Sequence, residues 1–237
     1  MQQLEAGIHH FKANYFASNR ELFEQLATTG QRPETLFITC SDSRIVPNLI
    51  TNAAPGELFI VRNVGNIVPL VDRGVLGGVS AAIEYAVEML EVGSIIVCGH
   101  THCGAIEAIL HPERVRHLPY VSRWLDESSR IPELIEQRYG HLDEQARVTA
   151  AVQENVLVQL ENLRSFDFVA RKLDAGKIKM NGWVFQIATG DVFDYDPISE
   201  QFFQLGGPDD RRRSVLSSRP PPLDDVPQSP PRPDPHR

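Results

Sequence analysis

Two short segments of the chain carry side chains that can bind a metal ion. The first, residues 40–44 (CSDSR), begins with Cys40, and the second, residues 98–104 (CGHTHCG), contains His100 and Cys103. Thiolates and imidazole are ligands that zinc prefers, and three protein ligands leave the fourth tetrahedral position open, as at catalytic zinc sites. The spacing therefore predicts one Zn²⁺ per subunit, bound by Cys40, His100 and Cys103.

A carboxylate and a guanidinium follow the first predicted ligand. Residues two apart in an extended backbone point to the same face, so Cys40, Asp42 and Arg44 are expected to lie together at a strand end. A bidentate pair with Arg44 would hold Asp42 ionised and turned away from the metal. Without that pair, the carboxylate could occupy the open metal position. Asp42 and Arg44 are therefore candidate residues beside the metal.

The neighbouring cysteine and histidine are interpreted as structural. Cys98 lies in an apolar run and is expected to be a small core residue, and His102 is expected to point away from the metal. Three cysteines are too few for a disulfide scaffold, and an odd number pairs badly. A thiol redox protein using Cys98 and Cys103 is an alternative, although their spacing is not the usual Cys-x-x-Cys.

The elements that must bring these segments together are short apolar runs at 36–38, 58–61 and 95–97. The runs are nearly continuous rather than alternating, which is typical of central parallel strands covered on both faces. A helix at 79–90 connects the second and third runs, as in an α/β fold. Because open α/β sheets bind ligands at the carboxyl ends of their strands, we expect the two candidate segments to meet there.

The rest of the chain completes an α/β fold with a mostly parallel central sheet and flanking helices. Apolar spacing predicts helices up to Gly30 and over most of 105–175, and residues 182–187 and 192–195 are predicted to form an antiparallel hairpin at one edge of the sheet. The predicted organisation is a helical arm at 1–30, a zinc-binding α/β catalytic domain at 31–205 and a Pro-rich disordered tail at 206–237.

Composition argues against two classes of partner. The chain has 237 residues, 42% of them hydrophobic, and a formal net charge of −8, whereas nucleic-acid binding needs a basic surface. No stretch approaches the ~20 apolar residues of a membrane span. The N-terminus also lacks the pattern of a secretory signal. We expect a cytoplasmic protein that binds neither nucleic acid nor membrane.

Four sequence blocks resemble the β-class carbonic anhydrases. Each block alone is weakly specific, but their order and spacing over roughly residues 5–200 are highly specific in combination. The resemblance implies reversible hydration of CO2 to bicarbonate and a proton, with zinc on the three predicted ligands and Asp42 and Arg44 as the catalytic pair beside it. The blocks are CSDSR at 40–44, RNVGN at 62–66, AAIEY at 81–85 and CGHTHCG at 98–104.

The resemblance also implies a pocket for CO2. Gln31 stands where the plant-like subtype has a glutamine that hydrogen-bonds substrate, and Phe59, Val64 and Tyr85 stand where it has an apolar wall. The backbone amide of Gly104 is a second candidate donor. Ordinary core packing would explain the three apolar residues equally well. In the family this pocket forms across a dimer interface, which implies a homodimer or higher even oligomer with the site between subunits.

Further details concern the branch of the family. A bicarbonate-inhibited subtype has tryptophan three residues before the first cysteine ligand, and Phe37 here argues against that regulatory site. The long helical middle and the Pro-rich tail resemble the cyanobacterial, carboxysome-associated branch. That likeness implies localisation in the cytoplasm or carboxysome, and a carboxysome shell or scaffold protein as partner.

Two other functions fit the same motifs. A carbon disulfide hydrolase on this scaffold would need the same zinc chemistry, and comparing turnover of CO2 and CS2 would separate the two. A non-catalytic, zinc-stabilised carboxysome subunit would bind partners through its tail. Such a scaffold has no need of Asp42, Arg44 and Gln31, which therefore favour the enzyme.

Overall fold

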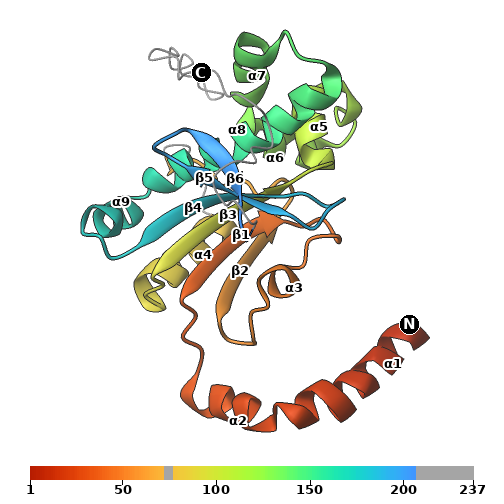
Figure 1. The fold of residues 1–237 in the computed structure, drawn as a ribbon, viewed down its shortest axis with the longest axis vertical. Coiled ribbons are helices and arrows are strands. Elements are labelled where there is room, and N and C mark those ends of the chain that lie inside the picture. The colour runs from red at the N-terminus through yellow and green to blue at the C-terminus, as the bar shows by residue number, and fades with distance from the viewer. Residues whose placement is uncertain (72–76, 207–237) are drawn as a thin grey trace, which may run out of the picture.

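A computed structural model of the protein describes residues 1–71 and 77–206 (Figure 1). Its centre is a six-stranded sheet of β1 (Thr35–Cys40), β2 (Leu58–Asn63), β3 (Ser94–His100), β4 (Lys179–Phe185), β5 (Val192–Asp196) and β6 (Gln201–Gln204). Their spatial order is β2-β1-β3-β4-β5-β6. The first four neighbours are parallel, and β5 and β6 continue the sheet as antiparallel strands. The predicted α/β sheet and its edge hairpin are confirmed.

The register of the parallel strands aligns the two candidate segments. β1 lies between β2 and β3, with Thr39 opposite Cys98 and Cys40 opposite Asn63. β1 ends at Cys40 and β3 ends at His100, so both strands finish at the same edge of the sheet. This edge is the carboxyl end at which parallel sheets hold their ligands.

Helices occupy most of the chain outside the sheet, as the apolar spacing predicted. Helix α4 is continued by the π-helical turn η3, and the predicted 79–90 helix is therefore two joined pieces. The helices are α1 (Gln2–Phe11), α2 (Arg20–Thr29), α3 (Pro47–Thr51), α4 (Gly78–Glu84), α5 (Gly104–Leu110), α6 (Pro119–Leu125), α7 (Ile131–Tyr139), α8 (Glu144–Arg164) and α9 (Asp167–Asp174), with π-helical turns η1 (Lys12–Phe16) and η3 (Tyr85–Met89) and 3-10 turns η4 (Pro112–Arg114) and η5 (Asp126–Ser128).

The two faces of the sheet are packed differently. On one face, apolar residues of the strands join those of α4, α5, α7, α8 and α9 in the main core. The other face carries a small cluster of Phe37, Ile96 and Cys98, with Trp183 packed against it. Cys98 lies opposite Thr39, and alternate residues of a strand point to opposite faces. Cys98 and Cys40 therefore belong to different clusters. Cys98 is fully buried, as its interpretation as a core residue requires.

Helix α8 is the longest helix and lies close over β3 and β4. Asp143 precedes its first residue, and the Asp143 carboxylate accepts a hydrogen bond of 2.8 Å from the Ala146 amide and so caps the helix. A Cβ atom on Gly99 would lie 2.8 Å from Cγ2 of Val156, inside the distance that side chains tolerate. Gly99 therefore lets the helix approach the strand next to His100.

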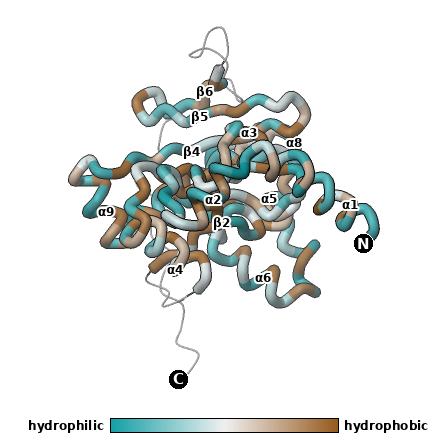
Figure 2. The backbone as a smooth tube through the Cα atoms, turned by 90° about the horizontal axis from the view of Figure 1, so that it is seen from below, coloured by the Kyte–Doolittle hydropathy of each residue, from teal (hydrophilic) through white to brown (hydrophobic). Residues whose placement is uncertain are grey.

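The N-terminal helices form an arm that extends from the body of the molecule (Figure 1). Neither α1 nor α2 buries any residue. Hydrophobic and hydrophilic residues are mixed along both helices (Figure 2). Four aromatic rings, those of Phe11, Tyr15, Phe16 and Phe23, contact one another along the arm. The predicted helical arm is confirmed, and it ends at Gly30, whose positive φ of 78° stops α2.

Two features differ from or lie beyond the prediction. Strand β6 was not predicted, because its four residues carry only two apolar side chains. The predicted disorder of the Pro-rich tail concerns residues 207–237, which lie outside the described part of the chain. Among residues 1–71 and 77–206, no helix combines the length and the apolarity that crossing a bilayer requires.

Candidate metal centre

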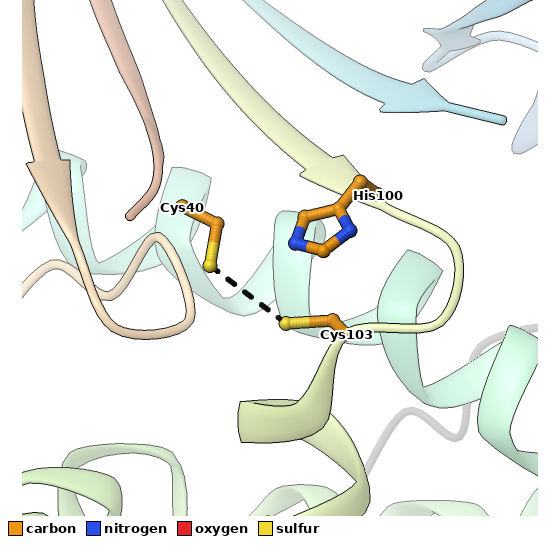
Figure 3. A group of neighbouring side chains, drawn as sticks. All are labelled: Cys40, His100 and Cys103. Carbon is orange, nitrogen blue, oxygen red and sulfur yellow. Dashed lines mark hydrogen bonds between the residues drawn. The ribbon is translucent and has the colours of Figure 1, made fainter. Parts of the chain in front are cut away.

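Cys40, His100 and Cys103 converge at the carboxyl edge of the sheet (Figure 3). Cys40 is the last residue of β1, His100 is the last of β3, and Cys103 directly precedes α5. Their donor atoms all lie within 4.8 Å of one another, and all three residues are buried. The two sulfurs are 3.9 Å apart. Two sulfurs on one tetrahedral zinc are separated by about 3.8 Å, so the spacing fits that metal.

The orientation of the His100 ring also suits metal binding. Its Nδ1 donates a hydrogen bond of 2.9 Å to the carbonyl oxygen of Thr101, because a carbonyl can only accept. That bond leaves the lone pair on Nε2. Nε2 is buried and has no hydrogen-bond partner among the described residues. A buried, unpaired nitrogen aimed at two sulfurs is costly unless a metal binds it, so these residues fit a metal ion.

The two sulfurs of the site also differ in their affinity for protons. The hydrogen bond with Cys103 lowers the pKa of Cys40 to about 4, against the opposing effect of burial. The same hydrogen bond, together with burial, raises the pKa of Cys103. The lowered pKa of Cys40 favours its thiolate, the form of cysteine that binds metals.

Asp42 and Arg44 lie beside the three donors. Arg44 donates to both carboxylate oxygens of Asp42, from Nε to Oδ1 at 2.9 Å and from one terminal nitrogen to Oδ2 at 2.7 Å. These bonds hold the pKa of the Asp42 carboxyl well below its usual range. Asp42 Oδ2 is 3.9 Å from Nε2 of His100. The predicted bidentate pair is present at the site.

The route by which Asp42 reaches this position differs from the expectation. β1 ends at Cys40, and the amide of Ile45 donates to the carbonyl of Asp42 in a turn. The extended backbone predicted through Arg44 is therefore wrong. The pair forms because the Arg44 amide also donates to Asp42 Oδ1 at 2.9 Å, which closes the turn around the carboxylate.

Two further groups hold this turn and were not predicted. Arg62 donates to the carbonyl oxygens of Cys40 and Asp42, at 3.1 and 2.7 Å. The carbonyl of His102 accepts a hydrogen bond of 2.9 Å from Arg44. Arg62 belongs to a recognised sequence block, but only the register of β1 and β2 reveals its contacts. His102 itself is exposed and is absent from the group of converging donors, as expected.

The predicted pocket residues fall into two groups. Val64 and Gly104 adjoin the metal centre, since Val64 follows β2 directly and Gly104 is the first residue of α5. A cavity of about 620 Å³ lies beside Val64, with Ser41, Asn63 and Trp124 also in its wall.

Gln31, Phe59 and Tyr85 lie elsewhere in the same chain. Phe59 is paired with Leu36, four residues before Cys40, which is a distance of roughly 13 Å along the strand. Its ring contacts that of Tyr85, with centroids 5.9 Å apart. Gln31 is exposed and precedes the amino end of β1. The single chain therefore brings only two of the five predicted pocket residues to the metal centre.

Comparison with known proteins agrees with this geometry. A family model described as carbonic anhydrase matches residues 35–192, which include all three donors. A carbonic anhydrase from Synechocystis is 43% identical over 85% of this chain and 73% of its own length. The chain belongs to the β-carbonic anhydrase family.

Solved structures of β-carbonic anhydrases share the fold. The structure of CcaA has a TM-score of 0.82 and 43% identity, and the match covers 85% of this chain and 98% of that one. A tetrameric β-carbonic anhydrase from Sordaria macrospora has a TM-score of 0.70 and 28% identity, over 87% of this chain and 96% of that one. The family assignment excludes the thiol redox alternative, for which Cys98 is also on the wrong face of the sheet.

Proposed function

We propose that the chain catalyses the reversible hydration of CO2 to bicarbonate and a proton, with one Zn²⁺ held by Cys40, His100 and Cys103. The observation that carries the proposal is the buried, unpaired Nε2 of His100 beside two sulfurs 3.9 Å apart. When bound, zinc would supply the Lewis acidity that makes water a nucleophile near neutral pH. The donor set of two sulfurs and one imidazole suits this metal and leaves one position for a small molecule.

The Asp42 carboxylate would accept a hydrogen bond from the reacting water. Its low pKa means that it stays ionised at neutral pH, so it can accept this bond but cannot supply a proton. Arg44 holds both carboxylate oxygens, which keeps Asp42 from turning toward the sulfurs and the imidazole. The pair would therefore orient the nucleophile and keep the fourth position free.

CO2 is apolar and needs little more than a shaped space and one donor. Val64 supplies an apolar side chain that is 42% exposed in the single chain. Apart from its chain neighbours and the backbone of its own helix, no residue comes within 4 Å of the position that a Cβ on Gly104 would take, so the space beside this helix start is open. The Gly104 amide could donate to a substrate oxygen there.

We propose that a second copy of the chain completes the pocket with its Gln31, Phe59 and Tyr85. These residues lie far from the donors of their own chain, and Tyr85 is 45% exposed although it is large and aromatic. A homodimer or higher even oligomer would bury it against the cavity beside Val64. The tetrameric relative from Sordaria macrospora supports an oligomer in this family.

We propose that the protein is cytoplasmic and that its C-terminal residues 207–237 recruit it to a carboxysome shell or scaffold protein. The similarity to the Synechocystis enzyme and the proline-rich composition of this segment support the proposal. A pull-down from a carboxysome preparation should recover the full chain but not a chain ending at residue 206. Equal recovery of both would refute a role for the segment.

Stopped-flow CO2 hydration, with zinc content measured on the same sample, tests the main function. We expect turnover in proportion to zinc content for the wild type, and neither zinc nor turnover for Cys103→Ala. A zinc-loaded wild type without CO2 hydration would refute the proposal. Turnover of CS2 in place of CO2 would identify the alternative hydrolase.

A further inference from the structure

Helix α8 carries a row of buried polar residues that the catalytic scheme does not use. Asn155, Gln159 and Asn162 are four and three residues apart, so they share one face of the helix. Their exposed fractions are 1%, 0% and 2%. Buried amides are costly unless they are hydrogen-bonded, so this row needs a structural or functional reason.

All three side chains bind the backbone of the segment that follows β2. The side-chain amide of Asn155 donates to the carbonyl of Gly65 at 3.0 Å. The amide of Val68 donates to Gln159 Oε1 at 2.8 Å, and Asn162 donates to the carbonyl of Val68 at 2.8 Å. The helix thus fixes residues 65–68 at two points.

Hydrogen bonds among the amides of this row and to Ser128 hold the side chains in place. Gln159 donates to Asn155 Oδ1 at 2.9 Å and to the hydroxyl of Ser128 at 3.1 Å, and Ser128 donates to Asn155 Oδ1 at 3.3 Å. Asn155 Oδ1 therefore has two donors, and its amide nitrogen is left to face Gly65. A connected buried network of this kind allows only one orientation of each amide.

The other side of the same glycine faces the metal centre. The Gly65 amide donates to the sulfur of Cys40 at 3.5 Å. Gly65 has a φ of 85° and Asn66 a φ of 50°, two successive left-handed residues, and the second is unfavourable for a side chain other than glycine. Such a turn persists only when its surroundings hold it.

We infer that Asn155 is a positioning residue that, braced by Gln159 and Ser128, aims the Gly65 amide at the metal-binding sulfur of Cys40. The inference deepens the proposed metal site and rests on it. The Asn155 amide and the Cys40 sulfur bind opposite ends of one residue. The Gly65 carbonyl and amide belong to neighbouring peptide planes joined at its Cα, so release of the carbonyl loosens the turn that presents the amide to the sulfur. Partners of metal ligands typically change metal affinity by about 10- to 100-fold when they are lost.

Asn155→Ala tests the inference directly. Ser128→Ala is a milder second variant, since it removes a brace without touching residues 65–68. Glu154→Gln is the matched control, because Glu154 is the adjacent buried polar residue of α8 and binds Tyr139 at 2.9 Å instead. Melting temperatures of all three full-length proteins would measure the general loss of stability.

Two readouts report on the sulfur itself. Zinc affinity is measured by competition with a chromogenic chelator, and the sulfur-to-cobalt charge-transfer band is measured in the Co²⁺-substituted protein. We expect Asn155→Ala to weaken zinc binding about tenfold or more. The band should move to lower energy, because a thiolate that loses a hydrogen bond gives up charge more readily. Ser128→Ala should change both in the same direction by less, and Glu154→Gln should change neither.

The inference is overturned if Asn155→Ala lowers the melting temperature but leaves zinc affinity within twofold of wild type and the band unmoved. It is also overturned if Glu154→Gln shifts the band as far as Asn155→Ala does. If Asn155→Ala does not fold, the same criteria apply to Ser128→Ala. Failure of the proposed function would give a different result, because the wild-type protein itself would then bind zinc without hydrating CO2.

Discussion

The carboxyl and amino edges of the parallel sheet differ in how complete they are in one chain. At the carboxyl edge, three buried donors converge within 4.8 Å, and Arg44 clamps Asp42 beside them. At the amino edge, Gln31 is exposed and Tyr85 is 45% exposed, without contact to any donor. The metal half of the site is thus built by one chain, whereas three of the predicted substrate residues lie apart from it in that chain.

This difference follows from how each half is held. The metal half depends on strand register and on short turns, both of which are determined within the chain. Of the predicted substrate residues, Gln31 and Tyr85 are exposed, and Phe59 is only partly buried against the core. Variants at the two edges should therefore fail in different ways.

Loss of a ligand should have the largest effect. Cys40→Ala removes one of three donors and should abolish zinc binding and CO2 hydration together. Cys98→Ala is the matched control, because Cys98 is equally buried but lies on the other face of the sheet. Metal analysis by mass spectrometry and a hydration assay would check both. Full zinc occupancy in Cys40→Ala would contradict the ligand set.

Arg44→Ala should have the next largest effect. It leaves all three donors intact, so zinc content should stay near one per chain. The freed Asp42 could then occupy the substrate position, and kcat/KM should fall by about 100-fold or more. Arg44→Lys keeps the charge but cannot form the bidentate pair, so it should recover little of the loss. Normal turnover in Arg44→Ala would rule out the clamp.

A mixing experiment should give a smaller but more discriminating effect. Gln31→Ala should keep zinc and lose about tenfold in kcat/KM, because a substrate donor is missing. Mixed with Cys40→Ala subunits under refolding or co-expression, it should recover to roughly a quarter of wild-type turnover if sites are shared between paired subunits. Random pairing yields half mixed dimers, each with one complete site of two.

The control for that experiment is a mixture of Cys40→Ala with Cys103→Ala. Both substitutions affect the same half of the site, so no pairing can assemble a complete one. If Gln31→Ala gains nothing from Cys40→Ala while this control also stays inactive, each site lies within a single chain. The two edges of the sheet would then be independent.

Much of the metal half could be predicted from sequence. The apolar runs located β1 and β3. The rule that parallel sheets bind ligands at the carboxyl ends of their strands then predicted that Cys40 and His100 lie close together. The turn at Asp42 could not be predicted, because it depends on the Arg44 amide and side chain binding the same carboxylate. Strand β6 could not be predicted either, because its few apolar residues do not indicate a strand and its pairing with β5 holds it in the sheet.

The row of polar residues on α8 shows most clearly what the periodicity of apolar residues cannot predict. Val148, Val152 and Val156 have the spacing of an apolar helix stripe, and all three are buried. Asn155 and Gln159 lie on the same face as that stripe, seven residues after Val148 and Val152, so the spacing gives them a buried position but not the partners of their polar groups. Those partners are residues 65–68 and Ser128, which only the tertiary structure reveals.

The missing side chain at Gly99 has a consequence for engineering the protein. Val156 lies so close to this position that even a methyl group would push helix and strand apart, and Val156 is the neighbour of Asn155 in α8. Thermostabilising designs commonly replace glycine by alanine to reduce the freedom of the unfolded chain. At Gly99 the added methyl group would instead force helix α8 and strand β3 apart. An apolar contact would thereby displace His100 and Asn155, the chain neighbours of the two residues that collide.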